Sequence, residues 1–202
     1  GGNTDTFDLD ADARAQWQGS GHRVRLMFGY GYETADGERQ AEETFAHLRH
    51  NLRLADWVHS LAFTQWQRNP FQRLRSRLLL GVGARFDLVR GDEVRASLGA
   101  AHMVEIEQID DAGGTDTEQR LSSFLDVAWK LSETATLSTT AFVQPLWSDF
   151  ADLRAIGEVS LETRLVGGLS LLTAANAQYD SEPPDDVETT DWEISTGLRL
   201  RL

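Results

Sequence analysis

The C-terminal segment from Trp192 to Leu202 alternates between apolar and polar side chains along its length. Successive side chains of a β-strand point to opposite faces, so this period of two predicts a strand with two chemically different faces. Because unpaired charge is costly to bury, the charged face must meet water or opposite charge. The apolar face comprises Trp192, Ile194, Thr196, Leu198, Leu200 and Leu202, and the other face comprises Asp191, Glu193, Ser195, Gly197, Arg199 and Arg201.

The same alternation recurs in about eleven segments that together cover nearly the whole chain. Between Leu74 and Leu88, for example, apolar side chains alternate with arginines and glycines. The segments are mostly about 12 to 16 residues long, whereas strands of globular proteins usually have about five or six. The pattern therefore predicts an all-β, antiparallel, up-and-down protein with long strands.

Composition narrows the class further. The mean hydropathy is −0.38, and no run approaches the roughly 18 to 20 apolar residues that a membrane-spanning helix needs. This excludes a helical membrane bundle but not a membrane β-barrel, in which a polar inner face offsets the apolar outer face. The chain has no cysteine, which excludes disulfides and cysteine-based metal sites. The net charge of −13 argues against nucleic acid as a partner.

Short and long connections alternate between the predicted strands, which is typical of transmembrane β-barrels with tight periplasmic turns and longer external loops. Outward aromatic side chains lie beside both kinds of connection, as expected at two membrane interfaces. The alternative is a soluble sandwich in which the apolar face is the core and the charged face is solvated. The short connections are 19–21, 55–56, 90–93, 132–134 and 166–168, and the long ones are 34–40, 68–71, 108–117, 148–152 and 180–190.

The parity of the strands predicts one further strand. The chain ends at the periplasmic rim in this scheme, but it begins at an external loop, whereas bacterial barrels have an even number of strands. We therefore expect a strand that precedes Gly1, in a single barrel domain of about twelve strands of which residues 1–202 form about eleven.

Two stretches resemble the YdiY-like, salt-induced outer-membrane protein family. Gly2 to Thr6 is similar to its GNTDT-type motif, and Tyr179 to Pro184, followed by Asp191 and Gly197, is similar to its C-terminal signature. The resemblance implies a Gram-negative outer-membrane barrel of uncharacterised function. The chain end also resembles the signal read by the barrel-assembly machinery, although Leu202 stands where Phe is usual; the residues concerned are Ser195, Gly197, Leu200 and Leu202.

Charged side chains on the predicted inner face suggest a charge-separated lumen. Near the external rim, acids come from the first, second, third and last strands, and arginines come from the fifth, seventh and ninth. Walls of opposite charge set ion selectivity in narrow pores. The acidic wall comprises Asp8, Asp10, Glu33, Glu43, Asp191 and Glu193, and the basic wall comprises Arg73, Arg75, Arg77, Arg120 and Arg154.

The function expected from this lumen is a narrow passive channel or a pore that binds a small charged solute, with no enzymatic activity and no cofactor. The expected surroundings are the lipid bilayer and lipopolysaccharide, whose phosphates the loop acids 110–111 and 185–186 could bridge through divalent cations. One alternative is a non-conducting structural or stress-related barrel whose charges pair across the lumen. The less favoured alternative is an outer-membrane hydrolase.

The histidines give little support to a metal site or to catalysis. His47 and His50 are three residues apart and therefore lie on opposite faces of a strand, which makes them a poor pair of metal ligands. A hydrolase would need serine, histidine and a carboxylate together, for which His47 with Asp126 or Glu158 is a candidate set. No nucleophile motif accompanies these residues.

Arginine in place of Leu80 or Leu198 tests the orientation of the apolar face. If these positions meet lipid near the bilayer midplane, the substitution costs about 2 to 4 kcal/mol of folding free energy. Urea titration of the protein folded into lipid vesicles measures this cost. Unchanged stability of Leu80→Arg would contradict the lipid-facing assignment.

Overall fold

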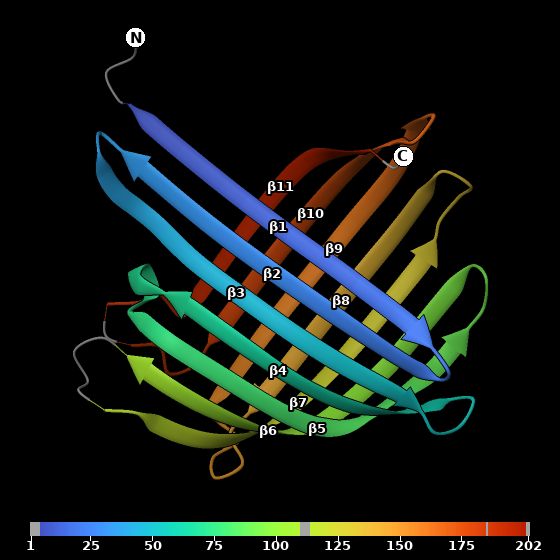
Figure 1. Cartoon of the computed structure of the whole chain (residues 1–202), viewed down its shortest axis with the longest axis horizontal. Helices are drawn as coiled ribbons and strands as arrows, with labels where there is room; N and C mark the ends of the chain where they lie inside the picture. The colour runs from blue at the N-terminus through green and yellow to red at the C-terminus, as the bar shows by residue number, and fades with distance from the viewer. Residues whose placement is uncertain (1–4, 110–113, 185, 201–202) are drawn as a thin grey trace. The chain divides into compact units, whose positions relative to one another are not determined.

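The computed structural model describes residues 5–109, 114–184 and 186–200, and consists of antiparallel strands joined in chain order (Figure 1). Each expected segment forms one strand, so the described residues contain eleven strands, as predicted. A single turn of 3-10 helix, Pro70–Gln72, separates β4 from β5. The strands are β1 (Thr6–Gly19), β2 (His22–Ala35), β3 (Glu38–Arg53), β4 (Val58–Asn69), β5 (Leu74–Arg90), β6 (Val94–Ile109), β7 (Asp116–Lys130), β8 (Ala135–Pro145), β9 (Leu153–Val166), β10 (Leu169–Asp180) and β11 (Thr190–Leu200).

Every strand pairs with its neighbours in the sequence, so the sheet order runs from β1 to β11 without a crossover. The chain divides into two compact units. The first comprises Gly1–Leu54, His59–Gly83 and His102–Arg120, and the second comprises Ala55–Val58, Ala84–Ala101 and Leu121–Leu202. The expected strand before Gly1 stays a prediction.

Two hairpin turns have the chemistry that tight antiparallel connections need. Ser20 and Gly21 have φ of 51° and 82°, and Asp36 and Gly37 have φ of 52° and 81°. Positive φ at both central residues matches the twist of the flanking strands, and glycine adopts it without a steric penalty. The long connection expected over 34–40 is therefore wrong, because Asp36 and Gly37 alone join β2 to β3.

The two faces of the sheet differ in exposure as well as composition. On the apolar face Val82 and Leu198 are 64% and 68% exposed, and the large exposed hydrophobic side chains come from every strand. The buried hydrophobic residues are few: Leu61, Leu74, Leu79, Ala101, Met103 and Phe124. Leu74 departs from the expected exposure of its face: it lies two residues after the 3-10 turn and is buried. In the described part of the chain, no helix has the length and apolarity to cross a membrane.

Two inner-face glycines leave room for phenylalanine rings. A Cβ atom at Gly81 would lie 2.2 Å from the ring of Phe63, and one at Gly99 would lie 2.1 Å from the ring of Phe124. Each ring therefore lies directly over its glycine, in the space that a larger side chain at that position would occupy. This close approach explains glycine in the middle of a strand, where it otherwise weakens the sheet.

Several sequence-based assignments lie outside the described residues. They are the start of the GNTDT-type motif at residues 2–4, the loop acids 110, 111 and 185, and Arg201 and Leu202 at the chain end.

Gly81→Ala tests the packing of Phe63 over the glycine. The added methyl group must displace the ring, so we expect a loss of about 1 to 3 kcal/mol in unfolding free energy. Gly157→Ala is the matched control, because nothing lies within 4 Å of its Cβ position in β9. Chemical denaturation measures both variants, and Phe63→Leu should restore stability to Gly81→Ala. Equal stability of the two glycine variants would contradict the packing assignment.

Candidate functional site

A ladder of charged side chains links three neighbouring strands of the first unit on the polar face. We call Arg77 of β5, Glu105 and Glu107 of β6, and Glu118 and Arg120 of β7 the polar ladder. Strand β6 lies between β5 and β7 in the sheet order. The period of two places Glu105 beside Glu107 on one face, and it does the same for Glu118 and Arg120.

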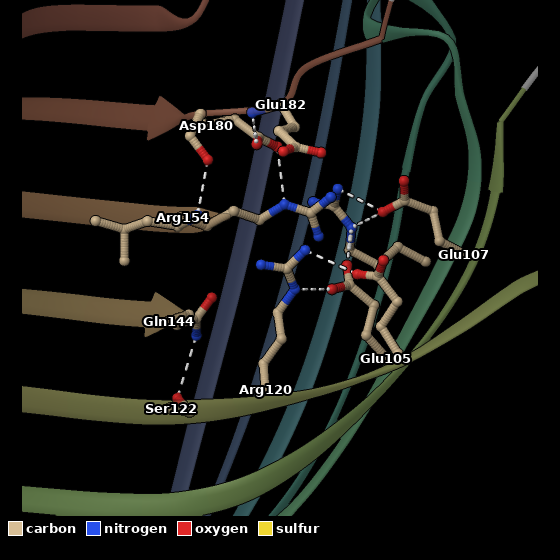
Figure 2. A network of polar contacts seen from close by, with 12 residues as sticks. Glu105, Glu107, Arg120, Ser122, Gln144, Arg154, Asp180 and Glu182 are labelled. Atoms are coloured by element: carbon tan, nitrogen blue, oxygen red, sulfur yellow. Dashed lines mark hydrogen bonds and ion pairs between the residues drawn. The ribbon is translucent and has the colours of Figure 1, made fainter. Parts of the chain in front are cut away.

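Arg77 and Arg120 of the polar ladder share Glu105 between them. Figure 2 shows Arg120 together with Glu105 and Glu107. Arg77 Nε lies 2.8 Å from Glu105 Oε1, and Arg77 Nη2 lies 2.6 Å from Glu107 Oε2. Arg120 Nε donates to Glu105 Oε2 at 2.7 Å, and Arg120 Nη2 donates to Glu118 Oε2 at 2.8 Å. Charges of alternating sign therefore cross the three strands in a continuous row.

Burial makes the centre of the polar ladder a fixed part of the structure. The side chains of Arg120 and Glu105 are 1% and 2% exposed. Buried charges are tolerated when they are paired and hydrogen-bonded, and removal of one partner then leaves the other uncompensated. Each of the three carboxylates of the ladder has at least one guanidinium partner, so the row is held together by ion pairs along its whole length.

Arg77, Arg120 and Arg154 of the predicted basic wall each have an acidic partner within their own unit. Arg77 and Arg120 belong to the polar ladder. In the second unit, Arg154 Nε donates to Asp180 Oδ2 at 2.8 Å (Figure 2). Arg73 follows the 3-10 turn with φ of 56°, and Arg75 lies near the start of β5.

The sequence analysis predicted acids on the first, second, third and last strands opposite these arginines. It did not predict the acidic partners of Arg77 and Arg120 on β6 and β7. Glu105, Glu107 and Glu118 were absent from the predicted acidic wall. The alternation through Met103, Glu105 and Glu107, interleaved with Val104 and Ile106, was the signal that could have placed the first two on the inner face.

The acids predicted on the first three strands do come together on the polar face of the first unit. Asp8 pairs with Glu33 across β1 and β2, and Gly31 lies in register between Asp10 and Glu43. A Cβ at Gly31 would lie 3.1 Å from Glu43 Cγ and 3.3 Å from Asp10 Oδ1, so both side chains flank the glycine. Asp12 lies beside Gly29 in the next row and was not predicted. We call Asp8, Asp10, Asp12, Glu33 and Glu43 the acidic end.

The opposite end of the same face is basic. Arg25 pairs in register with Gln16 and with Arg49, and Arg25 Nε donates to Gln16 Oε1 at 3.0 Å. One row nearer the Ser20–Gly21 turn, Arg23 Nε donates to Gln18 Oε1 at 3.3 Å. Charge on β1 to β3 therefore changes sign along the strands, from the acidic end to these arginines.

In the second unit, the predicted acids of the last strand lie among amides. Asp191 pairs in register with Gln178, and Glu193 pairs with Asn176, which pairs on its other side with Glu158. The predicted assembly residues Ser195, Gly197 and Leu200 lie in β11, and Leu202 lies outside the described residues.

His47 lies on the polar face of β3 and is 4% exposed. Its ring stacks between Phe45 and Phe63, with centroid separations of 6.1 and 5.9 Å. Its Nδ1 atom lies 2.8 Å from Gln65 Oε1, an amide rather than a carboxylate. Among the described residues, no group of three His, Asp or Glu side chains is placed to hold a metal ion.

The comparisons with known proteins agree with the fold. The model of a family described as "Protein of unknown function, DUF481" matches residues 1–200. A search of curated proteins found no match.

Among solved structures, the chain is similar to the NanC porin, with 10% sequence identity and a TM-score of 0.56 over 96% of this chain and 99% of that chain. The KdgM porin in complex with disordered oligogalacturonate aligns with 8% identity and a TM-score of 0.45, covering 97% and 99% of the two chains. The translocator domain of the autotransporter NalP from Neisseria meningitidis aligns with 14% identity and a TM-score of 0.47, covering 98% and 82%. The similarity to the NanC porin is a similarity of fold, and together with the strand order it confirms the predicted all-β, antiparallel, up-and-down fold class.

Arg120→Ala tests the polar ladder. It leaves Glu105 buried without one of its partners, and we expect a loss of about 3 to 5 kcal/mol in folding free energy. Arg199→Ala is the control, because Arg199 is 41% exposed in its 2.9 Å pair with Glu162, and such pairs contribute about 0 to 1 kcal/mol. Equilibrium denaturation in detergent micelles compares the two. An Arg120→Ala cost no larger than that of Arg199→Ala would rule out a structural role for the ladder.

Proposed function

This chain belongs to the family of proteins of unknown function DUF481, and we propose that it is a narrow passive channel of the bacterial outer membrane. Its polar face lines a water-filled path for small charged solutes, and its apolar face meets lipid. The outer-membrane location rests on the porin-type fold together with the exposed apolar face. The YdiY-like assignment, insertion by the barrel-assembly machinery through the end of β11, and contact with lipopolysaccharide belong to the same proposal.

The observation that carries the proposal is the change of charge sign along one polar face. Asp8, Asp10, Asp12 and Glu33 of the acidic end are exposed side chains. Gly29 lies opposite Asp12 and Gly31 lies opposite Asp10 in register, and neither glycine carries a side chain into the space above the sheet. Exposed carboxylates concentrate cations, and arginines further along the strands then meet anions or the anionic groups of a solute.

The arginines of the predicted basic wall have a different part in this proposal. Arg77 and Arg120 are fixed by the polar ladder, so they shape the wall of the path and carry little uncompensated positive charge. Selectivity in this unit then comes mainly from the acidic end.

A non-conducting structural barrel is the second candidate, and the burial of the polar ladder favours it. A row of ion pairs as buried as Arg120 and Glu105 resembles protein interior rather than the wall of an open pore. In that case the barrel contributes to the outer membrane through its surface, and the charges serve packing.

Conductance in planar lipid bilayers separates the two candidates. We expect single-channel currents from the wild-type protein and, under a salt gradient, a reversal potential that indicates cation preference. Replacing Asp8, Asp10 and Asp12 with Asn should shift this potential toward anions. One carboxylate about 10 Å from an ion in water contributes about 0.4 kcal/mol, so loss of all three lowers the cation-to-anion permeability ratio several-fold.

The control for this experiment carries neutral substitutions outside the polar face. Asp92→Asn with Glu93→Gln changes two exposed acids in the turn between β5 and β6, and should leave the reversal potential close to that of the wild type. Absence of current from correctly inserted wild-type protein would favour the structural barrel. An unchanged potential in the triple Asn variant would remove the acidic end as the source of selectivity.

A further inference from the structure

The apolar face of the first unit contains a groove over β4. Its volume is about 490 Å³, and its lining includes Leu48, Ala62, Thr64, Leu80 and Val82. Leu48 pairs in register with Thr64, and His50 pairs with Ala62. Small side chains on β4 therefore lie between leucine and valine side chains of the adjoining strands β3 and β5, and β4 forms the floor of the groove.

One end of the groove is polar. His50 lines it, and His50 Nε2 lies 2.9 Å from His22 Nδ1. The two rings stack with centroids 5.2 Å apart and planes 22° apart. His22 begins β2 directly after the Ser20–Gly21 turn, so the pair lies at the short-turn rim of the sheet. The nearby positions on this face of β2 and β3 are apolar and carry Val24, Leu26 and Leu48.

The histidine pair leaves a hydrogen-bond donor available. One imidazole N–H is used between the two rings, and each ring has a second nitrogen outside that bond. When both rings are neutral, one of these two nitrogens carries a proton, and when the pair takes up a proton, both do. An anionic oxygen is the partner that such donors bind most strongly.

The depth of the pair suits a lipid headgroup. His50 lies three residues from Arg53, the end of β3, which is about 10 Å along a strand and less along the membrane normal because barrel strands are tilted by about 35 to 45°. The pair therefore lies near the boundary between hydrocarbon and headgroups, and the groove extends from it toward the membrane interior.

We propose that the groove binds one acyl chain of a glycerophospholipid and that the His22–His50 pair binds its phosphate. The site rests on the proposed membrane placement, in which this face meets the hydrocarbon of the periplasmic leaflet. The apolar floor of the groove, which is continuous with the lipid-facing surface, fits an acyl chain. The imidazole donors at the polar end of the groove fit the phosphate. The ligand class is therefore a phospholipid rather than an acylglycerol, which has the same acyl chains but no phosphate.

Native mass spectrometry of the full chain, released from detergent micelles, tests the site. The probes are dioleoylphosphatidylglycerol and dioleoylglycerol, which share acyl chains and differ in the phosphate. We expect one phosphatidylglycerol to be retained per wild-type chain. His22→Leu with His50→Leu should weaken phosphatidylglycerol binding by about tenfold, the size of one charge-assisted hydrogen bond, and leave dioleoylglycerol binding unchanged.

Filling the groove tests the acyl-chain half of the proposal. Ala62→Leu with Thr64→Leu should abolish the retention of both probes. Thr173→Leu with Ala175→Leu is the matched control, because it enlarges the same residue types with the same spacing on the apolar face of β10, and should retain wild-type binding.

Three outcomes would overturn the site. The first is unchanged lipid retention in the groove-filled variant. The second is a wild-type dimer that this variant loses, because the groove then holds a second copy of the chain. The third is an equal loss of binding of both probes in the histidine variant, which would contradict a contact between the histidine pair and the phosphate. Insertion into vesicles is measured separately by protease protection: a wild-type chain that inserts but retains no lipid contradicts this site alone, and a chain that does not insert contradicts the proposed membrane placement as well.

Discussion

The structure depends on one constraint: each strand must satisfy its backbone hydrogen bonds through its neighbours while it presents different chemistry on its two faces. Pairing in chain order meets the backbone requirement for β2 to β10 without a crossover between strands. In hydrocarbon, where no water can hydrogen-bond the backbone, closed β-sheets and helices are the only viable spanning structures. Once the backbone is satisfied, the side-chain alternation alone decides which face can meet lipid and which can meet water.

The sequence predicted the strands and their faces well because the period of two is a local property. The C-terminal alternation from Trp192 and the repeat from Leu74 to Leu88 correspond directly to β11 and β5. The lengths of the connections were harder to predict from local sequence. The polar stretch 34–40 suggested a long loop, but Asp36 and Gly37 form a tight turn there. Leu74 shows the same limit, since it is buried although the alternation places it on the exposed apolar face.

Partners were harder to predict than faces. Arg77 and Arg120 were placed on the inner face, but their carboxylates on β6 and β7 were missed, because pairing depends on register between strands as well as on facing. Register also assembles the acidic end, in which Asp12 adds to the predicted acids. Single-strand patterns therefore predict which side chains line a path, and cross-strand register determines which of their charges remain uncompensated. The arginines of the polar ladder have acidic partners, whereas Asp8, Asp10 and Asp12 are exposed, and this difference underlies the proposal that the acidic end sets selectivity.

Single-cysteine scanning along β9 tests the central claim most directly, because the native chain has no cysteine. Cysteine is placed in turn at Gly157, Glu158, Val159, Ser160, Leu161 and Glu162 of the protein inserted in lipid vesicles. A water-soluble maleimide should react at the even positions, and a fluorophore at the odd positions should be quenched by a nitroxide in the acyl chains. This alternation with a period of two is the result that the account predicts. Equal water accessibility at odd and even positions, with no quenching from the lipid phase, would contradict it.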